Sequence, residues 1–411
     1  MIFVCELGFV DGAHVPFNAG LLATIRAAFP EEELFFFGAP SHIEELKRQL
    51  DLPLAGSVSW TEILPPNPSA TYLARFFCEL KIIRSLLRIL SRGDRRRLLL
   101  TSAYPSTLVA LKLAMRFRSE NINVQVVLHG FLSGVVGKRY RRPIRRFQEM
   151  RTALTFLGNS NIQYIVLEEF VRNTLVSHVP TLSGKVEALD HPLSPNEAGS
   201  HVNDLDAPVR FGFLGLASES KGFPLFVRLA KEVTAKYGHQ AEFHAIGRFP
   251  ADGTPVPAVG EMGALATKPG VIRMSRADFI HGVRRLAFII LPYEEVCYGL
   301  SASGTLLDAI AWEKPVIARS IPIFKSMFEK HGDIGYLFRD EAELRIIVER
   351  ILQKGDKSHY RRQVLNIRNT RSARTPSALA AFYREICRKQ EAARVSAHLS
   401  RPSRDPAKHI G

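Results

Sequence analysis

The sequence predicts an α/β protein built from two doubly wound, Rossmann-like domains that face each other across a cleft. Its 411 residues are too many for one ordinary hydrophobic core and suit two domains with a tail. Short runs of β-branched and aromatic residues alternate with amphipathic stretches, which is the pattern of parallel sheets flanked by helices. A polar segment at 191–208 with three prolines interrupts the alternation, so we expect a linker there.

The pattern of apolar runs begins at the first residues and starts afresh after the linker. In the first half it predicts strands at 2–6, 34–37, 98–101, 124–128 and 163–167, with helices at 73–90 and 105–118. In the second half it predicts strands at 209–214, 241–246, 271–274, 288–291 and 315–318, with helices at 223–236 and 304–312. A last helix at 377–394 precedes an end at 400–411 that we expect to be disordered. The predicted parts are an N-terminal domain at 1–196, a C-terminal domain at 207–370 and a helix with a basic tail at 371–411.

Cysteine usage and the start of the chain indicate a cellular compartment. Cys5, Cys78, Cys297 and Cys387 never fall in CxxC spacing, which excludes a cysteine zinc site and fits a reducing compartment. The first six residues lack the basic start of a signal peptide. No run approaches the ~20 uninterrupted apolar residues of a spanning helix. We therefore expect a cytoplasmic protein, either free or peripheral on the inner face of the membrane.

The net charge of +15 is concentrated in two stretches. Arg75 to Arg151 contains eighteen Lys and Arg against four Asp and Glu, and 354–411 contains fourteen against four. Within the first stretch, apolar residues recur at helical spacing over 73–90, with basic residues between them. This face can rest on an anionic membrane surface, or it can be the solvated back of a helix that faces the core. No nucleic-acid-binding module accompanies the charge, so we expect no nucleic acid as a partner.

The segment 211–223, FGFLGLASESKGF, is the strongest local signal. It predicts a buried strand that ends at Gly215, a loop of small residues, and Lys221-Gly222 at the start of a helix. Glycine lets the backbone approach a ligand closely, and unpaired N–H groups at a helix start favour an anion. The ammonium of Lys221 adds a full charge that suits a diphosphate. The segment matches neither GxGxxG nor GxxxxGK[ST], and the alternative is an ordinary turn with a surface lysine.

A second segment of this kind follows the strand expected at 288–291. Ser303 is suited to cap the helix that begins after it, which gives a second helix start able to hold phosphate. Asp308 lies about one turn inside that helix. It can accept hydrogen bonds from paired sugar hydroxyls, or it can be a solvated helix residue.

Both segments resemble the C-terminal domain of the group 1, or family 4-like, glycosyltransferases, which have the GT-B fold. The resemblance covers residues 209–320 and includes Lys314-Pro-Val. It implies that Lys221 contacts the diphosphate of a donor and that the amides near Ser303 do the same. Asp308 takes the place of the glutamate that binds ribose. The donor site is then expected to contain Gly215, Lys221, Gly222, Arg248, Tyr298, Ser303, Gly304 and Asp308.

Two positions depart from the family pattern. The first of the family's paired acids would fall at Leu300, which cannot act as an acid, so we look to Glu295 or Glu294 in the preceding loop. The arginine that often follows the strand-end glycine is replaced by Leu216. Arg248, after the next strand, is the candidate substitute.

The loop after the first strand is similar in place to the glycine-rich loop that borders acceptor and donor in GT-B enzymes. It contains Asp11, Gly12 and His14, and Asp11 is a base only if the enzyme inverts. His129, at a strand end, resembles the histidine that faces the donor sugar in this family. The alternative is a satisfied histidine at a strand terminus. We assign His129 and Glu295 as catalytic.

The resemblance implies a glycosyltransferase that uses a nucleotide-diphosphate sugar and a polysaccharide or lipid-linked saccharide acceptor. It further implies retention of configuration, no cofactor and no required metal. Lys221 and two helix starts would supply the positive potential that a leaving diphosphate needs. The alternatives are a non-catalytic sugar-nucleotide-binding protein, which the leucine at 300 favours, and a nucleotide-sugar epimerase.

Overall fold

The computed structural model divides the chain into two compact units. Unit 1 comprises Met1–Asn196 with Pro376–Gly411, and unit 2 comprises Glu197–Thr375. The predicted tail at 400–411 lies outside the described residues. The structure describes residues 1–10, 12, 14–67, 69–91, 96–116, 122–137, 139–158, 161–195, 199, 205–250, 259–272, 274–294, 300 and 302–399.

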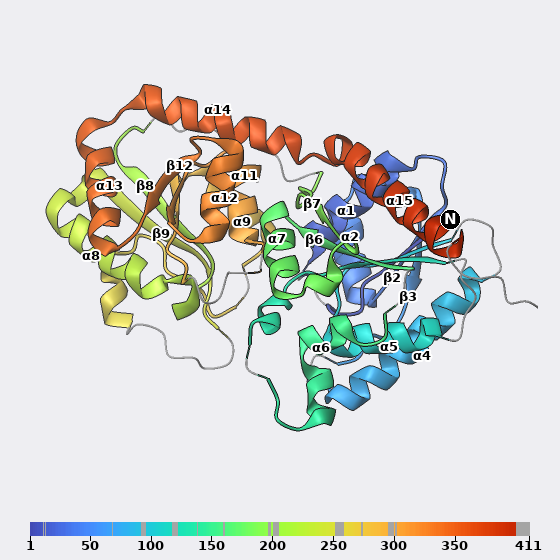
Figure 1. Cartoon of the computed structure of the whole chain (residues 1–411). Helices are drawn as coiled ribbons and strands as arrows, with labels where there is room; N and C mark the ends of the chain where they lie inside the picture. The colour runs from blue at the N-terminus through green and yellow to red at the C-terminus, as the bar shows by residue number, and fades with distance from the viewer. Residues whose placement is uncertain are drawn as a thin grey trace, which may run out of the picture. The chain divides into compact units, whose positions relative to one another are not determined.

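Unit 1 contains a seven-stranded parallel sheet with the order β3-β2-β1-β4-β5-β6-β7 (Figure 1). All five strands expected in this half are present. The sequence did not predict the two edge strands, which are short and partly exposed. The seven strands are β1 (Ile2–Cys5), β2 (Leu34–Gly38), β3 (Val58–Glu62), β4 (Arg97–Leu100), β5 (Asn123–Val127), β6 (Ile162–Leu167) and β7 (Val186–Leu189).

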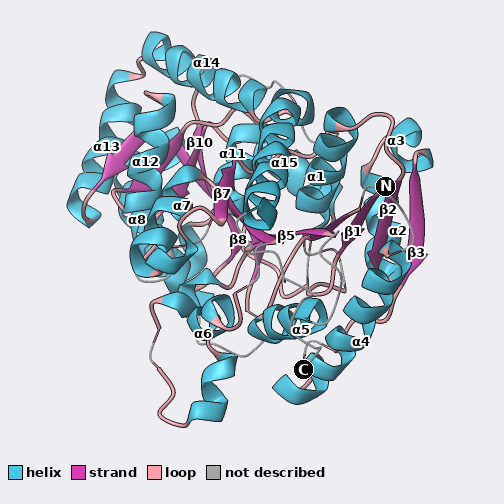
Figure 2. Ribbon diagram, turned by 45° about the vertical axis from the view of Figure 1, so that its right-hand side comes forward, coloured by secondary structure: helices cyan, strands magenta, loops and turns pink. Residues whose placement is uncertain are grey.

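Helices cover both faces of this sheet, as a doubly wound fold requires. On one face lie α1 (Val15–Ala28), α2 (Pro40–Gln49) and the last helix, α15 (Pro376–Leu399). On the other lie α4 (Tyr72–Leu90), α5 (Pro105–Arg116) and α6 (Met150–Thr155) (Figure 2). The remaining helices are α3 (Leu52–Gly56) and α7 (Glu169–His178), with short 3-10 turns η1 (Leu132–Val135), η2 (Pro143–Gln148) and η3 (Pro180–Leu182).

The last helix belongs to unit 1, although the chain reaches it only after unit 2. It packs along α1. The hydroxyl of Tyr383 donates to Gln125 Oε1 at 2.8 Å, and Gln390 Nε2 donates to the backbone oxygen of Val124 at 3.0 Å. These buried polar contacts fix α15 against the middle of the sheet.

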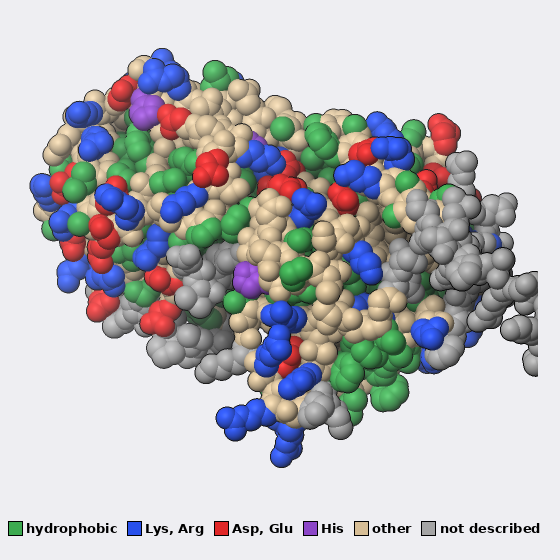
Figure 3. All heavy atoms as spheres, in the orientation of Figure 1, with side chains coloured by type: hydrophobic (Ala, Val, Ile, Leu, Met, Phe, Trp, Pro, Cys, Tyr) green, Lys and Arg blue, Asp and Glu red, His purple; other side chains and the backbone are tan. Residues whose placement is uncertain are grey.

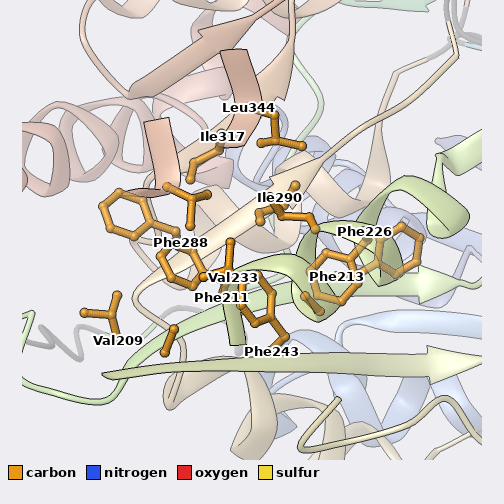
Figure 4. Packing of buried hydrophobic residues seen from close by; sticks show 14 of the residues in the cluster. Val209, Phe211, Phe213, Phe226, Val233, Phe243, Phe288, Ile290, Ile317 and Leu344 are labelled. Carbon is orange, nitrogen blue, oxygen red and sulfur yellow. The ribbon is translucent and has the colours of Figure 1, made fainter. Parts of the chain in front are cut away.

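Unit 2 contains a five-stranded parallel sheet with the order β12-β11-β10-β8-β9. Its core is rich in phenylalanine (Figure 4). The ring of Phe211 on β8, which lies between β10 and β9, stacks on Phe243 at 5.3 Å and on Phe288 at 5.9 Å, so three neighbouring strands share one aromatic layer. The strands are β8 (Val209–Leu216), β9 (Ala241–Arg248), β10 (Phe288–Leu291), β11 (Val316–Arg319) and β12 (Gly335–Phe338).

The helices of unit 2 follow its strands in alternation. They are α8 (Phe223–Tyr237), α9 (Arg276–Arg284), α11 (Gly304–Ala311), α12 (Pro322–His331), α13 (Glu341–Lys354) and α14 (Lys357–Ala373), with 3-10 turns η4 (Glu219–Lys221), η5 (Gly238–Gln240) and η6 (Val259–Ala264). No helix in the described part of the chain is both long and apolar enough to cross a bilayer.

Two expectations about local structure are wrong. The predicted strand at 271–274 is not a strand at its described residues, and the side chains of Val271 and Ile272 are 82% and 85% exposed. The pattern predicts a buried strand, but among the described residues nothing covers this apolar run. The predicted linker begins too early, since residues 191–194 are buried in unit 1. A Cβ on Gly20 would lie 2.7 Å from the Leu193 carbonyl oxygen, so α1 packs directly on this segment.

Candidate functional site

Strands β8 and β9 end side by side, and their last residues form the floor of the site in unit 2. Gly215 pairs with Gly247, and Leu216 pairs with Arg248. A Cβ on Gly247 would lie 1.8 Å from the Gly215 carbonyl oxygen. Only glycine allows this approach of the two backbones. The register therefore places Arg248 beside the position where the family pattern has its arginine.

The beginning of α8 is fixed by a tight turn. Gly222 adopts the left-handed conformation (φ +70°), and a Cβ there would lie 1.9 Å from the Pro292 carbonyl oxygen. The Glu294 amide donates to the Ser220 carbonyl oxygen at 3.1 Å. These contacts hold the Lys221 turn against the loop that follows β10.

The Lys221 ammonium reaches the beginning of α11. Its Nζ donates to Thr305 Oγ1 at 3.3 Å and lies 5.5 Å from the centre of the Tyr293 ring. A Cβ on Gly215 would lie 3.1 Å from the same Nζ and 3.7 Å from Thr305 Oγ1. The strand end, the Lys221 turn and the start of α11 therefore meet at one place.

Ser303 caps α11 as the sequence predicts. It is buried, and its Oγ accepts a hydrogen bond from the Leu306 amide at 3.2 Å. Gly304 is exposed, and nothing lies within 4 Å of where its Cβ would be. The first amides of a helix have no intrahelical acceptor. The start of α11 therefore presents N–H groups to open space next to the Lys221 ammonium.

A cavity of about 230 Å³ opens at this edge of the sheet. Asp308 Oδ1 accepts a hydrogen bond from Arg276 at 3.0 Å, and the Arg276 guanidinium lies over the Phe279 ring at 4.8 Å. The cavity thus combines an aromatic surface, a carboxylate and guanidinium groups, which can bind a molecule with an anionic part and hydroxyl groups. Its lining includes Gly215, Gly247, Arg248, Arg276, Phe279 and Asp308.

Four residues of the loop after β10 were considered for the site, and the structure describes two of them. Glu294 lies 3.3 Å from Arg319 in an ion pair. Leu300 is 2% exposed, so it is a core residue and no acid stands at its position. The predicted residues Glu295 and Tyr298 lie outside the described residues, and their assignment stays a prediction.

In unit 1, a buried carboxylate closes the end of β1. Glu6 accepts hydrogen bonds from the Gly8 amide at 2.7 Å and from Thr101 Oγ1 at 2.8 Å, as well as from the Ser102 hydroxyl. Burial alone would raise the pKa of Glu6, but the contacts with His14 and Ser102 and the charge of His42 outweigh it and lower the pKa to about 2. Glu6 is therefore ionised, and it holds the loop after β1 in place.

Three histidines gather beside this carboxylate. The His129 ring stacks on His14 at 4.3 Å and lies edge-on to His191 at 5.5 Å. His14 has a left-handed backbone (φ +66°), a strained conformation for a residue with a side chain, and its Nδ1 lies 3.7 Å from Glu6. Burial, followed by the charges of His14 and His191, lowers the pKa of His129 well below its usual range. His129 is therefore a neutral imidazole, and its Nδ1 has no hydrogen-bond partner among the described residues.

The structure places the predicted residues in two groups. Gly215, Lys221, Gly222, Arg248, Ser303, Gly304 and Asp308 come together in unit 2. His14 and His129 come together in unit 1, where Gly12 precedes α1 and its carbonyl oxygen accepts from the Val15 amide at 3.4 Å. Asp11 lies outside the described residues. Among the described residues, no group of three or more His, Cys, Asp or Glu side chains is placed to hold a metal ion.

Sequence reasoning missed four residues of these groups: Glu6, Thr305, Arg276 and His191. Glu6 is the last residue of the strand predicted at 2–6, and Thr305 directly follows the predicted residue Gly304. Arg276 and His191 carry no local signal, because they reach Asp308 and His129 only through the tertiary fold.

Comparisons with known proteins bear on the fold. No family model matches the sequence, and no curated protein matches it significantly. A glycosyltransferase from Rickettsia africae ESF-5 is similar in structure, with a TM-score of 0.63, 11% identity and coverage of 95% of this chain and 98% of that one. WaaG, a glycosyltransferase involved in lipopolysaccharide biosynthesis, matches with a TM-score of 0.61, 11% identity and coverage of 94% and 99%. Anabaena Alr3699/HepE in complex with UDP matches with a TM-score of 0.61, 14% identity and coverage of 95% and 99%. The chain therefore has the GT-B fold, with two parallel Rossmann-like sheets.

Proposed function

We propose that this protein is a glycosyltransferase that moves a sugar from a nucleotide-diphosphate sugar to a saccharide or lipid-linked saccharide acceptor. The observation that supports it most is the contact between Lys221 Nζ and Thr305 Oγ1 at 3.3 Å. It joins an ammonium to the start of α11, beside the strand end at Gly215. A diphosphate fits such a place, because both the charge and the free amides favour an anion.

The neighbouring cavity suits the nucleoside part of the donor. Phe279 offers a ring on which a base can stack, and Asp308 offers a carboxylate to ribose hydroxyls, with Arg276 holding that carboxylate in place. Arg248 adds a guanidinium at the end of β9. The fold supports the same reading by analogy, since HepE was solved with UDP.

The reaction needs stabilisation of a leaving diphosphate, which Lys221 and the α11 amides provide without a metal or cofactor in this proposal. His129 is assigned to the sugar. As a neutral imidazole it can donate a hydrogen bond to a hydroxyl without adding a charge. Membership in the group 1 subtype and retention of configuration remain part of the proposal, as does a role for Glu295 in place of the missing acid at Leu300.

Donor binding tests the proposal directly. Lys221→Ala is compared with Lys231→Ala, an exposed lysine farther along α8. Calorimetry with a panel of uridine, guanosine and adenosine diphosphate sugars should give binding for at least one donor. We expect an affinity loss on the order of 10- to 100-fold for Lys221→Ala and no loss for Lys231→Ala. Equal affinities in both variants would contradict the proposed diphosphate site.

Turnover separates the transferase from the two alternatives. A transferase releases nucleotide diphosphate faster when a saccharide acceptor is added. A non-catalytic binding protein binds the donor without release, and an epimerase changes the donor sugar with no acceptor present. Chromatography of the nucleotide products distinguishes these three results.

A further inference from the structure

A turn on unit 1 displays a dense group of arginines. We call residues 139–148, which include η2, the basic turn. Over this stretch five arginines are exposed, and among the described residues none of the five has an ion pair. They are Arg139, Arg141, Arg142, Arg145 and Arg146.

The nearest acid does not neutralise these arginines. Glu149 is buried, and its carboxylate accepts hydrogen bonds from the Tyr140 amide and from Thr152 Oγ1. The Arg146 Nε donates to the Tyr140 carbonyl oxygen at 3.2 Å. The turn also packs on α5 and α6, and the rings of Phe147 and Phe156 meet edge-on at 4.9 Å. The fold therefore holds the backbone of the turn in place and leaves the guanidinium groups in solvent.

Helix α4 presents a second exposed stripe on the same unit. Leu73 and Phe77 are each 63% exposed, and Lys81, Arg84 and Arg88 continue the stripe at helical spacing. These three cations have no ion pair in the described part of the chain. The opposite side of α4 is its core side and buries Leu80, Ile83, Leu86, Leu87 and Leu90.

Apolar and basic groups lie together at one end of unit 1. Figures 1 and 2 both place the start of α4 and the segment before α6 at the lower end of the unit. In Figure 3, hydrophobic side chains form a patch over α4, and Lys and Arg side chains project beside it. Val136 and Tyr140, 59% and 43% exposed, add apolar area next to the arginines. A contiguous exposed apolar patch with a charged rim marks an interaction surface.

We propose that the basic turn and the exposed stripe of α4 form a surface that docks on an anionic lipid bilayer. The arginines meet the phosphates and negative headgroups, while Leu73, Phe77 and Val136 enter the boundary between headgroups and acyl chains. Nucleic acid offers the same phosphates but gives no partner for isolated leucine and valine side chains. This inference goes beyond the proposed function and does not depend on it.

Vesicle sedimentation with the full chain tests the surface. The vesicles contain phosphatidylcholine with about 30 mol % phosphatidylglycerol, against phosphatidylcholine alone. Binding is expected to the anionic vesicles at about 0.1 M salt and to be largely lost at about 1 M, where the screening length falls to ~3 Å. No binding to anionic vesicles at low salt overturns the proposal.

Two matched pairs of variants locate the surface. Neutralising Arg141, Arg142, Arg145 and Arg146 to glutamine should lower the partition coefficient by roughly 600-fold, since each charge near the membrane contributes roughly fivefold. The control removes the same charge from unit 2 through Arg350, Lys354, Arg361 and Arg362 and should bind as the parent does. Equal losses in both would show non-specific attraction and overturn the assignment.

A second pair of variants tests the contribution of apolar side chains to vesicle binding. Phe77→Ser should weaken binding to anionic vesicles, whereas Phe382→Ser, at a phenylalanine that is 65% exposed on α15, should not. A single-stranded RNA of similar charge is the competing ligand. If RNA binds more tightly than the vesicles and Phe77→Ser changes neither, the surface is a nucleic-acid site and the proposal is wrong. Thermal unfolding of all variants checks that exposed substitutions leave the fold intact.

Discussion

Substitution of Gly222 by alanine tests how the Lys221 turn is held. Gly222 has φ +70°, and its added Cβ would lie 1.9 Å from the Pro292 carbonyl oxygen. The left-handed conformation costs an alanine about 1–2 kcal/mol. The overlap is with backbone, which cannot rotate away, so relief requires a shift that costs a further ~1–3 kcal/mol. We expect Gly222→Ala to destabilise unit 2 by about 2–5 kcal/mol.

Gly355 provides the matched control. It is also left-handed (φ +51°, ψ +39°), but nothing lies within 4 Å of its Cβ position. Gly355→Ala should therefore show only the conformational cost of about 1–2 kcal/mol. The difference between the two variants isolates the contact with Pro292.

Urea unfolding followed by fluorescence measures this difference. The chain has two tryptophans, Trp60 in unit 1 and Trp312 in unit 2. In a Trp60→Phe background the signal reports unit 2 alone. The midpoint of Gly222→Ala should fall below that of Gly355→Ala by roughly 0.5–1 M urea, and donor affinity should fall only for Gly222→Ala. Identical midpoints would refute the argument that this turn is fixed by its contact with the β10 loop.

Two pH-dependent predictions concern Glu79 and His129 of unit 1. Burial raises the pKa of Glu79 from its ordinary 4.5 to about 7, so folding favours its protonated form and stability is lost as pH rises from 4.5 toward 7. Glu79→Gln should thus raise the urea midpoint near pH 8, by the equivalent of up to about 3 kcal/mol, and change it little near pH 4; a gain that is independent of pH would contradict this. The lowered pKa of His129 has the opposite effect on stability. Below the ordinary pKa of 6.5 the unfolded chain takes up a proton while the folded protein does not, so stability falls as pH drops. His129→Phe should reduce that acid-side loss when midpoints at about pH 8 and pH 5.5 are compared, and an unchanged slope would show that other groups cause it.

Regular alternation of strands and helices was enough to predict the architecture, because each buried parallel strand is a short apolar run. The missed strands lack that property. In β3 the apolar residue Val58 is followed by exposed Ser59, Thr61 and Glu62. Val271 and Ile272 show the converse error, since a short apolar run has the same pattern whether it is covered or exposed.

The part of the candidate site that follows from the parallel strand topology could be predicted from the sequence. Loops after β8 and β10 must meet at one edge of the sheet because neighbouring parallel strands end there. That argument brings Lys221 next to the start of α11 without any knowledge of distances. It cannot find Arg276, because α9 reaches Asp308 from a different loop and neither residue has a partner at fixed sequence spacing.

The distribution of acids in unit 2 explains why the positive potential near Gly215 stays available for a ligand. Asp308 forms an ion pair with Arg276, and Glu294 forms one with Arg319. No described carboxylate forms an ion pair with Lys221, whose ammonium donates instead to the neutral hydroxyl of Thr305. A lysine with a purely structural role at a half-buried position gains most from a carboxylate, because the charge-assisted bond is about twice as strong as a neutral one. Asp308 instead fixes the Arg276 guanidinium at the cavity, and Glu294 pairs with Arg319, so the ammonium and the α11 amides remain for an anion that the protein itself does not supply.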